Sequence, residues 1–130
     1  MFKNLSATVL FVNDLEKCMK FYQDILGLKV IFSDDHSAAY KMEDHDFVLL
    51  KLSAAIEMVG EDAIDIHKGV GHRVLLCVGV EDVDASYEEF TAKGLQFLKP
   101  PKDQAWGRRT AYFADPEGNL WELWHELPDE

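Results

Sequence analysis

A duplicated pattern is the feature of this chain that most constrains its fold. Asn13-Asp14-Leu15 is matched by Glu81-Asp82-Val83, 68 positions later in the numbering, and Tyr22 is matched by Phe90 at the same offset. A repeat of this length is too long for the unit of a solenoid. It predicts one supersecondary module that is present twice, with an apolar face to bury in each copy.

Hydrophobic periodicity assigns the same order of elements to both halves of the 130 residues. The first half predicts a strand, a helix and three strands over residues 5–12, 14–26, 28–32, 37–42 and 47–52. The second half predicts the same order over residues 72–80, 82–92, 95–98, 108–114 and 119–125. Aspartate caps each helix and glycine follows it, whereas Pro100-Pro101 is expected to end the strand before it, because proline cannot donate to a ladder.

These elements predict an α+β fold of two βαβββ modules, which form curved mixed sheets around a shared cleft. The whole chain, residues 1–130, is expected to be a single domain. Module one covers about residues 1–53 and module two about residues 71–130. The acidic stretch between them, residues 54–70, is expected to be a connector with a short helical piece around residues 62–67.

Composition limits the partners of the chain. Lys and Arg total 13 against 24 Asp and Glu, so the formal net charge is −11. Such a surface repels phosphate backbones, which argues against nucleic-acid binding, and it favours cationic ligands. The two cysteines form no CxxC and predict no disulfide framework. We expect a cytoplasmic protein without a membrane partner, since the sequence has no signal-peptide layout and no apolar run long enough to span a bilayer.

The last predicted hairpin resembles the signature of a known superfamily. Residues 112–123, YFADPEGNLWEL, resemble the F-x-D-P-x-G-N-x-x-E pattern of the vicinal-oxygen-chelate superfamily. Val12-Asn13-Asp14-Leu15, followed by Phe21-Tyr22 and Leu26-Gly27, resembles its first-module pattern V-x-D-L…F-Y…L-G. The turn Ala105-Trp106-Gly107-Arg108-Arg109 resembles one in the bleomycin-resistance and glyoxalase-like branch.

This superfamily includes glyoxalases, extradiol dioxygenases, methylmalonyl-CoA epimerases, fosfomycin-resistance enzymes and bleomycin-resistance proteins. The resemblance spans nearly the whole chain and implies both the two-module fold and a homodimer. It does not select one reaction, because one fold carries many chemistries.

The resemblance also implies where a metal would be held. In metal-using members, the first strand of each module offers a His or Gln, and the last strand offers a Glu. These positions fall on Ala7, Lys51, Leu75 and Glu122, of which only the last has a suitable donor atom. The sequence therefore predicts no catalytic metal; a divalent metal would require a shift in strand register that brings His72 beside Glu122.

Period-two alternation predicts which side chains share the cleft with these positions. An apolar, partly aromatic pocket is expected, which suits a hydrophobic, planar or cationic small organic molecule. Arg108 and Arg109 either orient an anionic group of the ligand or only tie their turn, and the sequence leaves both roles open. The residues expected to contact the ligand are Val9, Phe11, Lys51, Arg73, Cys77, Trp106, Arg109 and Trp124.

Glu122 is the candidate catalytic residue, as a general base or a ligand contact, with a buried ion pair to Lys51 as the alternative. Three functions remain open. The first is a small-molecule-binding protein without a catalytic metal; the second is a metal-dependent lyase, isomerase or dioxygenase that uses Glu122 and atypical ligands. The third is a structural or interaction domain. The sequence favours them in this order and does not decide whether the chain is an enzyme.

Overall fold

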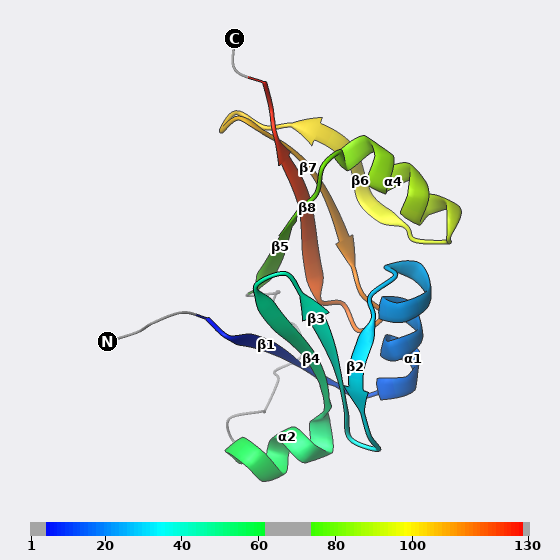
Figure 1. Cartoon of the computed structure of the whole chain (residues 1–130), viewed down its shortest axis with the longest axis vertical. Coiled ribbons are helices and arrows are strands. Elements are labelled where there is room, and N and C mark those ends of the chain that lie inside the picture. Colours follow the sequence, from blue (N-terminus) through cyan, green and yellow to red (C-terminus); the bar gives the residue numbers. More distant parts are fainter. Residues whose placement is uncertain (1–4, 62–73, 129–130) are drawn as a thin grey trace. The chain divides into compact units, whose positions relative to one another are not determined.

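The computed structural model describes residues 5–61 and 74–128. The chain divides into two compact units, Met1–Val70 and Gly71–Glu130, and each contains one four-stranded mixed sheet (Figure 1). The predicted α+β class with its duplicated module is therefore confirmed. Each unit is described by itself.

The first unit has a sheet with strand order β1-β4-β3-β2. The parallel pair is β1 (Ala7–Val12) with β4 (His45–Lys51), and antiparallel pairs join β4 to β3 (Ser37–Met42) and β3 to β2 (Val30–Ser33). Between β1 and β2 the chain forms α1 (Leu15–Lys20), which continues into a π-helical turn (Phe21–Ile25). Helix α2 (Leu52–Val59) follows β4 directly.

The core of the first unit is aromatic. Tyr22, Tyr40 and Phe47 are buried, and the rings of Tyr22 and Phe47 lie 4.9 Å apart between centroids. The Tyr40 hydroxyl donates to Gln23 Oε1 at 2.8 Å, so its polar end keeps a partner inside the unit. Desolvation by burial raises the pKa of Tyr40 to about 12. The π-helical turn therefore brings Tyr22 into the centre of this core.

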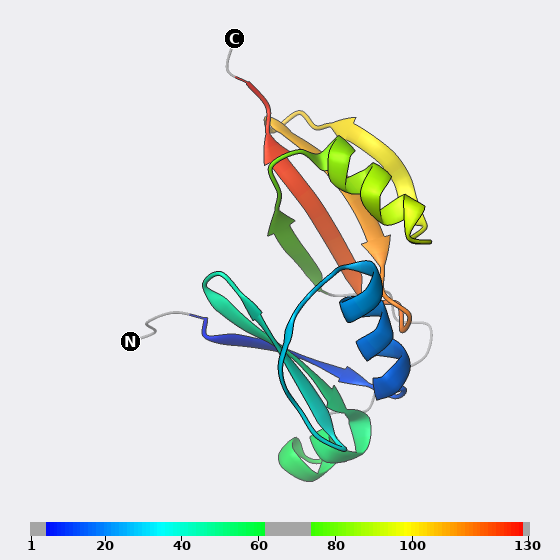
Figure 2. The same cartoon turned by 45° about the vertical axis from the view of Figure 1, so that its right-hand side comes forward.

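The second unit repeats the topology, with strand order β5-β8-β7-β6. The parallel pair is β5 (Leu75–Gly79) with β8 (Leu120–Glu126), and antiparallel pairs join β8 to β7 (Arg108–Ala114) and β7 to β6 (Phe97–Asp103). Helix α4 (Val83–Ala92) connects β5 to β6 and packs against β6, β7 and β8, as both cartoon views show (Figures 1 and 2).

Alternation along β7 and β8 gives this sheet two different faces. One face meets α4 and buries Phe113, Trp121 and Leu123, with the first two rings stacked at 6.2 Å between centroids. The opposite face carries Tyr112, Glu122 and Trp124. We call this second face the open face, because none of the helices described in this unit covers it.

The turn between β7 and β8 is built by one carboxylate. Asp115 Oδ1 accepts hydrogen bonds from the backbone N–H groups of Glu117 and Asn119, both at 2.9 Å, and Oδ2 accepts one from Asn119 Nδ2. Gly118 has a φ of +87°, which favours glycine over any side-chain-bearing residue. This turn fixes the register that sets Glu122 opposite Tyr112.

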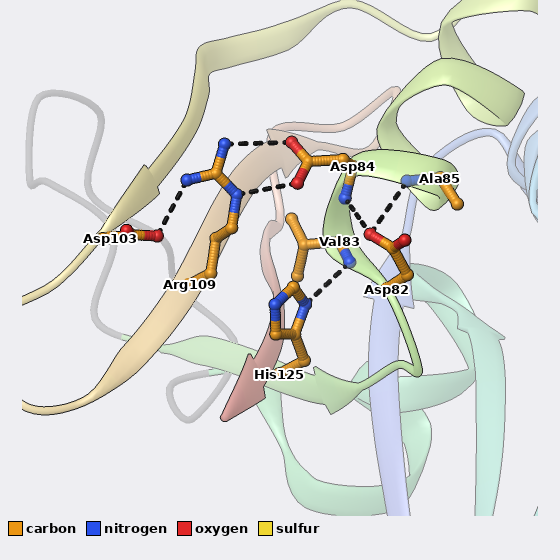
Figure 3. A network of polar contacts seen from close by, with 7 residues as sticks. All are labelled: Asp82, Val83, Asp84, Ala85, Asp103, Arg109 and His125. Carbon is orange, nitrogen blue, oxygen red and sulfur yellow. Dashed lines mark hydrogen bonds and ion pairs between the residues drawn. The ribbon is translucent and has the colours of Figure 1, made fainter. Parts of the chain in front are cut away.

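The first turn of α4 is capped by two different elements (Figure 3). Asp82 Oδ1 accepts from the N–H groups of Asp84 and Ala85, and His125 Nδ1 on β8 accepts from Val83 N at 2.8 Å. Because Nδ1 is the acceptor here, the proton of the neutral imidazole lies on Nε2. The orphan N–H groups that a helix start exposes are thus satisfied, and α4 is tied to the last strand.

Two predicted features differ from the structure. The stretch after β4 forms α2, whose residues Leu52–Val59 were expected to be the end of a strand and the start of a connector. Strand β6 continues through Pro100-Pro101 instead of ending there. It is the edge strand, and its register shifts on both sides of Lys99, so the prolines need not donate to a ladder. The helical piece predicted around residues 62–67 lies outside the described residues.

The cap from His125 can be tested by stability. His125→Phe keeps a planar ring but leaves Val83 N–H without its acceptor, and we expect a loss of about 1–3 kcal/mol in the free energy of unfolding. Urea unfolding followed by circular dichroism measures it. The exposed His36→Phe serves as the control and should change stability by no more than about 0.5 kcal/mol. Equal effects of the two substitutions would contradict this role.

Candidate functional site

The candidate site lies on the open face of the second unit and is centred on Glu122. The residue is 7 % exposed, although none of the helices that the structure describes in this unit covers this side of the sheet. Its neighbours are Cys77 on β5 and Tyr112 on β7, which the strand register places directly opposite it. A buried carboxylate between two hydrogen-bond donors is a feature that apolar packing alone does not require.

Tyr112 donates its hydroxyl proton to Glu122 Oε1 at 2.8 Å. The pKa of Tyr112 is raised, first by desolvation and then by the hydrogen bond and negative charge of Glu122. The phenol therefore remains protonated and keeps donating at neutral pH. On the other side of Tyr112, Gln104 Nε2 donates to Thr110 Oγ1 at 3.0 Å, which extends the polar row along β7.

Cys77 completes the polar centre from the β5 side. Cys77 is exposed as a residue, but partial desolvation raises the pKa of its thiol to about 11; the hydrogen bond and charge of Glu122 add to the rise, while Arg108 opposes it. The thiol is hence neutral at physiological pH and acts as a weak donor and not as a nucleophile. Glu122 thus accepts from the protein on two sides and keeps further lone pairs for a ligand.

Trp124 gives the open face its apolar surface, and Arg108 is stacked on it. The Arg108 guanidinium carbon lies 3.7 Å from the centre of the Trp124 ring. Gly79 allows this placement, because a Cβ at position 79 would come within 3.1 Å of Trp124 Cζ2. The side chain missing from Gly79 therefore leaves room for the indole ring against β5.

The residues of the chain do not fit the metal site that the resemblance implies. Strand register pairs Val9 with Val48 as it pairs Cys77 with Glu122, so Val48 occupies the position equivalent to Glu122. This corrects the alignment that put Lys51 there. Ala7, Val48 and Leu75 offer no donor atoms, and the described residues contain no group of three or more His, Cys, Asp or Glu placed to hold an ion.

The first unit holds three of the residues predicted to contact a ligand. Val9 and Phe11 lie on the face of their sheet that carries Val48, and Val9 is 40 % exposed. Lys51 ends β4, pairs with Val12 in the strand register and is the N-terminal cap residue of α2. It therefore does not share a face with Val9 and Phe11.

The other residues predicted to contact a ligand do not share one place in the second unit. Cys77 and Trp124 lie on the open face around Glu122, and Trp106 is 64 % exposed in the turn between β6 and β7. Arg109 lies on the opposite face, where it pairs with Asp84 of α4 at 2.9 Å and Asp103 of β6 at 2.8 Å (Figure 3). His72 and Arg73 lie outside the described residues.

The structure distinguishes the roles of Arg108 and Arg109, which the sequence left open. Arg109 ties α4 to β6, so its contacts are those of a structural residue. Arg108 is on the open face and makes no ion pair among the described residues. Sequence reasoning also missed Tyr112, although alternation from Ala114 inside β7 was a signal that placed it on the face of Glu122.

Comparison with known proteins decides the family. The family model described as Glyoxalase/Bleomycin resistance protein/Dioxygenase superfamily matches residues 4–123. The chain belongs to this superfamily. A Bacillus subtilis relative, the uncharacterized protein YraH, is 33 % identical over 121 residues, which are 91 % of this chain and 94 % of that protein. A probable lactoylglutathione lyase from Synechocystis is 30 % identical over 124 residues, which are 92 % of this chain and 92 % of that protein.

Solved structures of the superfamily share the fold. A glyoxalase/bleomycin resistance protein/dioxygenase from Nocardioides matches with a TM-score of 0.86 and 26 % identity, over 100 % of this chain and 87 % of that one. A glyoxalase-related enzyme from Fulvimarina pelagi matches with a TM-score of 0.79 and 25 % identity, over 95 % of this chain and 88 % of that one.

A fosfomycin resistance protein from Listeria innocua is 26 % identical in sequence, over 95 % of this chain and 90 % of its own length.

The coupling between Glu122 and Cys77 can be tested by thiol chemistry. Glu122→Gln removes the negative charge that helps to raise the Cys77 pKa, so the thiolate fraction at pH 8 should increase. We expect alkylation of Cys77 by iodoacetamide to become about 3- to 10-fold faster. Cys18 is buried and should stay unmodified, which mass spectrometry of the labelled peptides checks.

The control for this measurement is Glu88→Gln, which removes a charge from the exposed surface of α4. It should leave the alkylation rate at pH 8 unchanged. A rate in Glu122→Gln that is equal to, or lower than, that of the unmodified chain would contradict the described contact between the thiol and the carboxylate.

Proposed function

We propose that this chain is a small-molecule-binding protein of the glyoxalase/bleomycin-resistance type that works without the metal used by other members. The observation that carries the proposal is the buried Glu122 carboxylate, held between Tyr112 and Cys77 beside the Trp124 ring. The equivalent metal positions Ala7, Val48 and Leu75 carry only hydrocarbon side chains.

The contacts on the open face are those of a recognition site. An aromatic ring supplies apolar area, and a few polar groups placed around it set the orientation of a ligand. Trp124 offers the area, Glu122 accepts a hydrogen bond from the ligand, and Tyr112 holds the carboxylate in place. The ligand in this proposal is a small organic molecule with a planar, apolar part and at least one O–H or N–H donor.

Relatives support a small-molecule role without identifying the ligand. Their names refer to lactoylglutathione, in Synechocystis and Haemophilus influenzae, and to fosfomycin, in Listeria innocua. The second candidate function, a metal-dependent lyase, isomerase or dioxygenase, is favoured by these names and by the presence of Glu122. In that case Glu122 would need ligands other than those at the equivalent positions, with His72 the residue that the sequence suggests.

The homodimer and the cytoplasmic location expected from the sequence belong to the same proposal. None of the helices in the described part of the chain is long and apolar enough to cross a membrane. Sedimentation of the purified chain at several concentrations measures the oligomeric state.

Metal content separates the two candidate functions. Tag-free protein is incubated with Zn, Ni, Mn or Fe(II) salts, desalted and measured by elemental analysis. We expect far less than one metal ion per chain, because Glu122 alone cannot hold a divalent ion against water. Retention of one ion per chain, lost in Glu122→Gln, would contradict the proposal and favour the metal-dependent enzyme.

Ligand binding to the open face is tested with a fragment library of neutral, anionic and cationic aromatic compounds. Binding should shift the backbone amide resonances of β5, β7 and β8 in heteronuclear NMR spectra. Trp124→Leu should weaken the compounds that bind by about 3- to 10-fold, since an aromatic contact is lost. The exposed aromatic residue Phe32, changed to Leu, is the control and should leave affinities unchanged.

The binding proposal fails if no compound shifts these amides, or if the two substitutions weaken binding equally. Shifts confined to α4 and the opposite face would also contradict it, because Trp124 and Glu122 point away from that helix.

A further inference from the structure

The charge of the open face differs from the charge of the chain. Strand register pairs Lys99 with Tyr112 and Lys102 with Thr110, so both lysines belong to the face that carries Glu122. Arg108 and Glu126 are also paired with each other on this face. Among the described residues of this face, three basic side chains therefore stand against two acidic ones, whereas the whole chain has a formal charge of −11. The open face is locally cationic on an acidic protein.

Arg108 is the basic residue of the open face that contacts Trp124. Its guanidinium is stacked on Trp124, and its positive charge acts on the Cys77 thiol. It has no ion pair in the described ranges, although Glu126 is its partner in the strand register. Stacking uses the flat face of the guanidinium and leaves its N–H donors at the edge for another group.

The neighbouring arginine provides an internal comparison. Arg109 has two carboxylate partners, with three hydrogen bonds of 2.8–3.0 Å to Asp84 and Asp103. Arg108, one residue earlier in the same strand, faces the opposite side and has none of these bonds. A half-buried guanidinium held in place by an indole, but without an anion, is preorganised to bind one.

We propose that Arg108 is the anion-recognising residue of the open face and that the ligand is a small organic anion, such as a carboxylate, whose donor group reaches Glu122. This inference rests on the proposed binding function and specifies the class of ligand. The guanidinium edge binds the carboxylate through two parallel hydrogen bonds. The planar part of the ligand lies beside Trp124, and its hydroxyl or N–H donates to Glu122.

The proposal differs from one of the ligands expected from the sequence, which were hydrophobic, planar or cationic molecules. The cationic alternative rested on the expected aromatic pocket and on the net charge of the whole chain, which includes residues far from the site. Fields at a binding face are set mainly by charges within about 10 Å at moderate salt. Lys99, Lys102 and Arg108 are the basic residues that the structure describes on this face, and Glu122 already accepts from Tyr112 and Cys77.

Three matched compounds test the charge of the ligand. They are 4-hydroxybenzoate, 4-hydroxybenzamide and 4-hydroxybenzylamine, which share the ring and the hydroxyl and differ in charge. Each is titrated into the full chain at constant ionic strength, and affinity is followed by the amides of β5, β7 and β8. We expect 4-hydroxybenzoate to bind most tightly.

Substitutions of Arg108 test whether this side chain causes the preference for the anionic compound. Arg108→Gln should weaken 4-hydroxybenzoate by about 10-fold or more and leave 4-hydroxybenzamide nearly unchanged. Arg108→Lys keeps the charge and should recover part of the affinity, since an ammonium lacks the planar fork. Lys93→Gln, at the far end of α4, removes the same charge elsewhere and should have no effect. The spectra also report whether each variant is folded.

The outcomes separate this inference from the proposed function. Tighter binding of the benzylamine or the benzamide, or an unchanged benzoate affinity in Arg108→Gln, overturns the anion assignment while small-molecule binding stands. An equal loss in Lys93→Gln also overturns it, because the effect is then one of net charge. If none of the three compounds shifts the open-face amides, both proposals are contradicted for ligands of this class.

Discussion

The candidate site depends on the turn that Asp115 builds between β7 and β8. Its two carboxylate oxygens accept three hydrogen bonds, and so fix where β8 begins. A shift of one residue in that register would move Glu122 to the face under α4 and bring Trp121 to the open face. The turn residues of the motif that identifies the superfamily thus position the Glu122 carboxylate, with which the same motif ends.

The fold could be predicted from the sequence because its signals are local. Helix caps at Asp14 and Asp82, the glycines that follow and the alternation within strands are each decided by a few neighbouring residues. The prediction was wrong at Pro100-Pro101, since an edge strand with shifted register tolerates proline. It also missed α2, since the helical spacing of Leu52, Ala55 and Ile56 begins at the end of a strand.

The site could be predicted only in part. The position of Glu122 followed from the motif, and Cys77 and Trp124 followed from period-two alternation. The equivalent position in module one required the pairing of β1 with β4, a contact between distant segments, and counting along β4 gave Lys51 instead of Val48. The different roles of Arg108 and Arg109 could not be predicted from the sequence either, because they depend on which carboxylates the fold brings to each face.

The difference between the two modules bears on how many ligands each chain would bind. Duplication begins with two equivalent positions, but Val48 and Val9 now stand where the second module has Glu122 and Cys77. The first sheet can pack apolar groups there but cannot accept a hydrogen bond from a side chain at either position. Among the described residues, only the second module carries this pair of polar side chains, so the proposed binding function predicts one ligand for every chain in an assembly of identical chains.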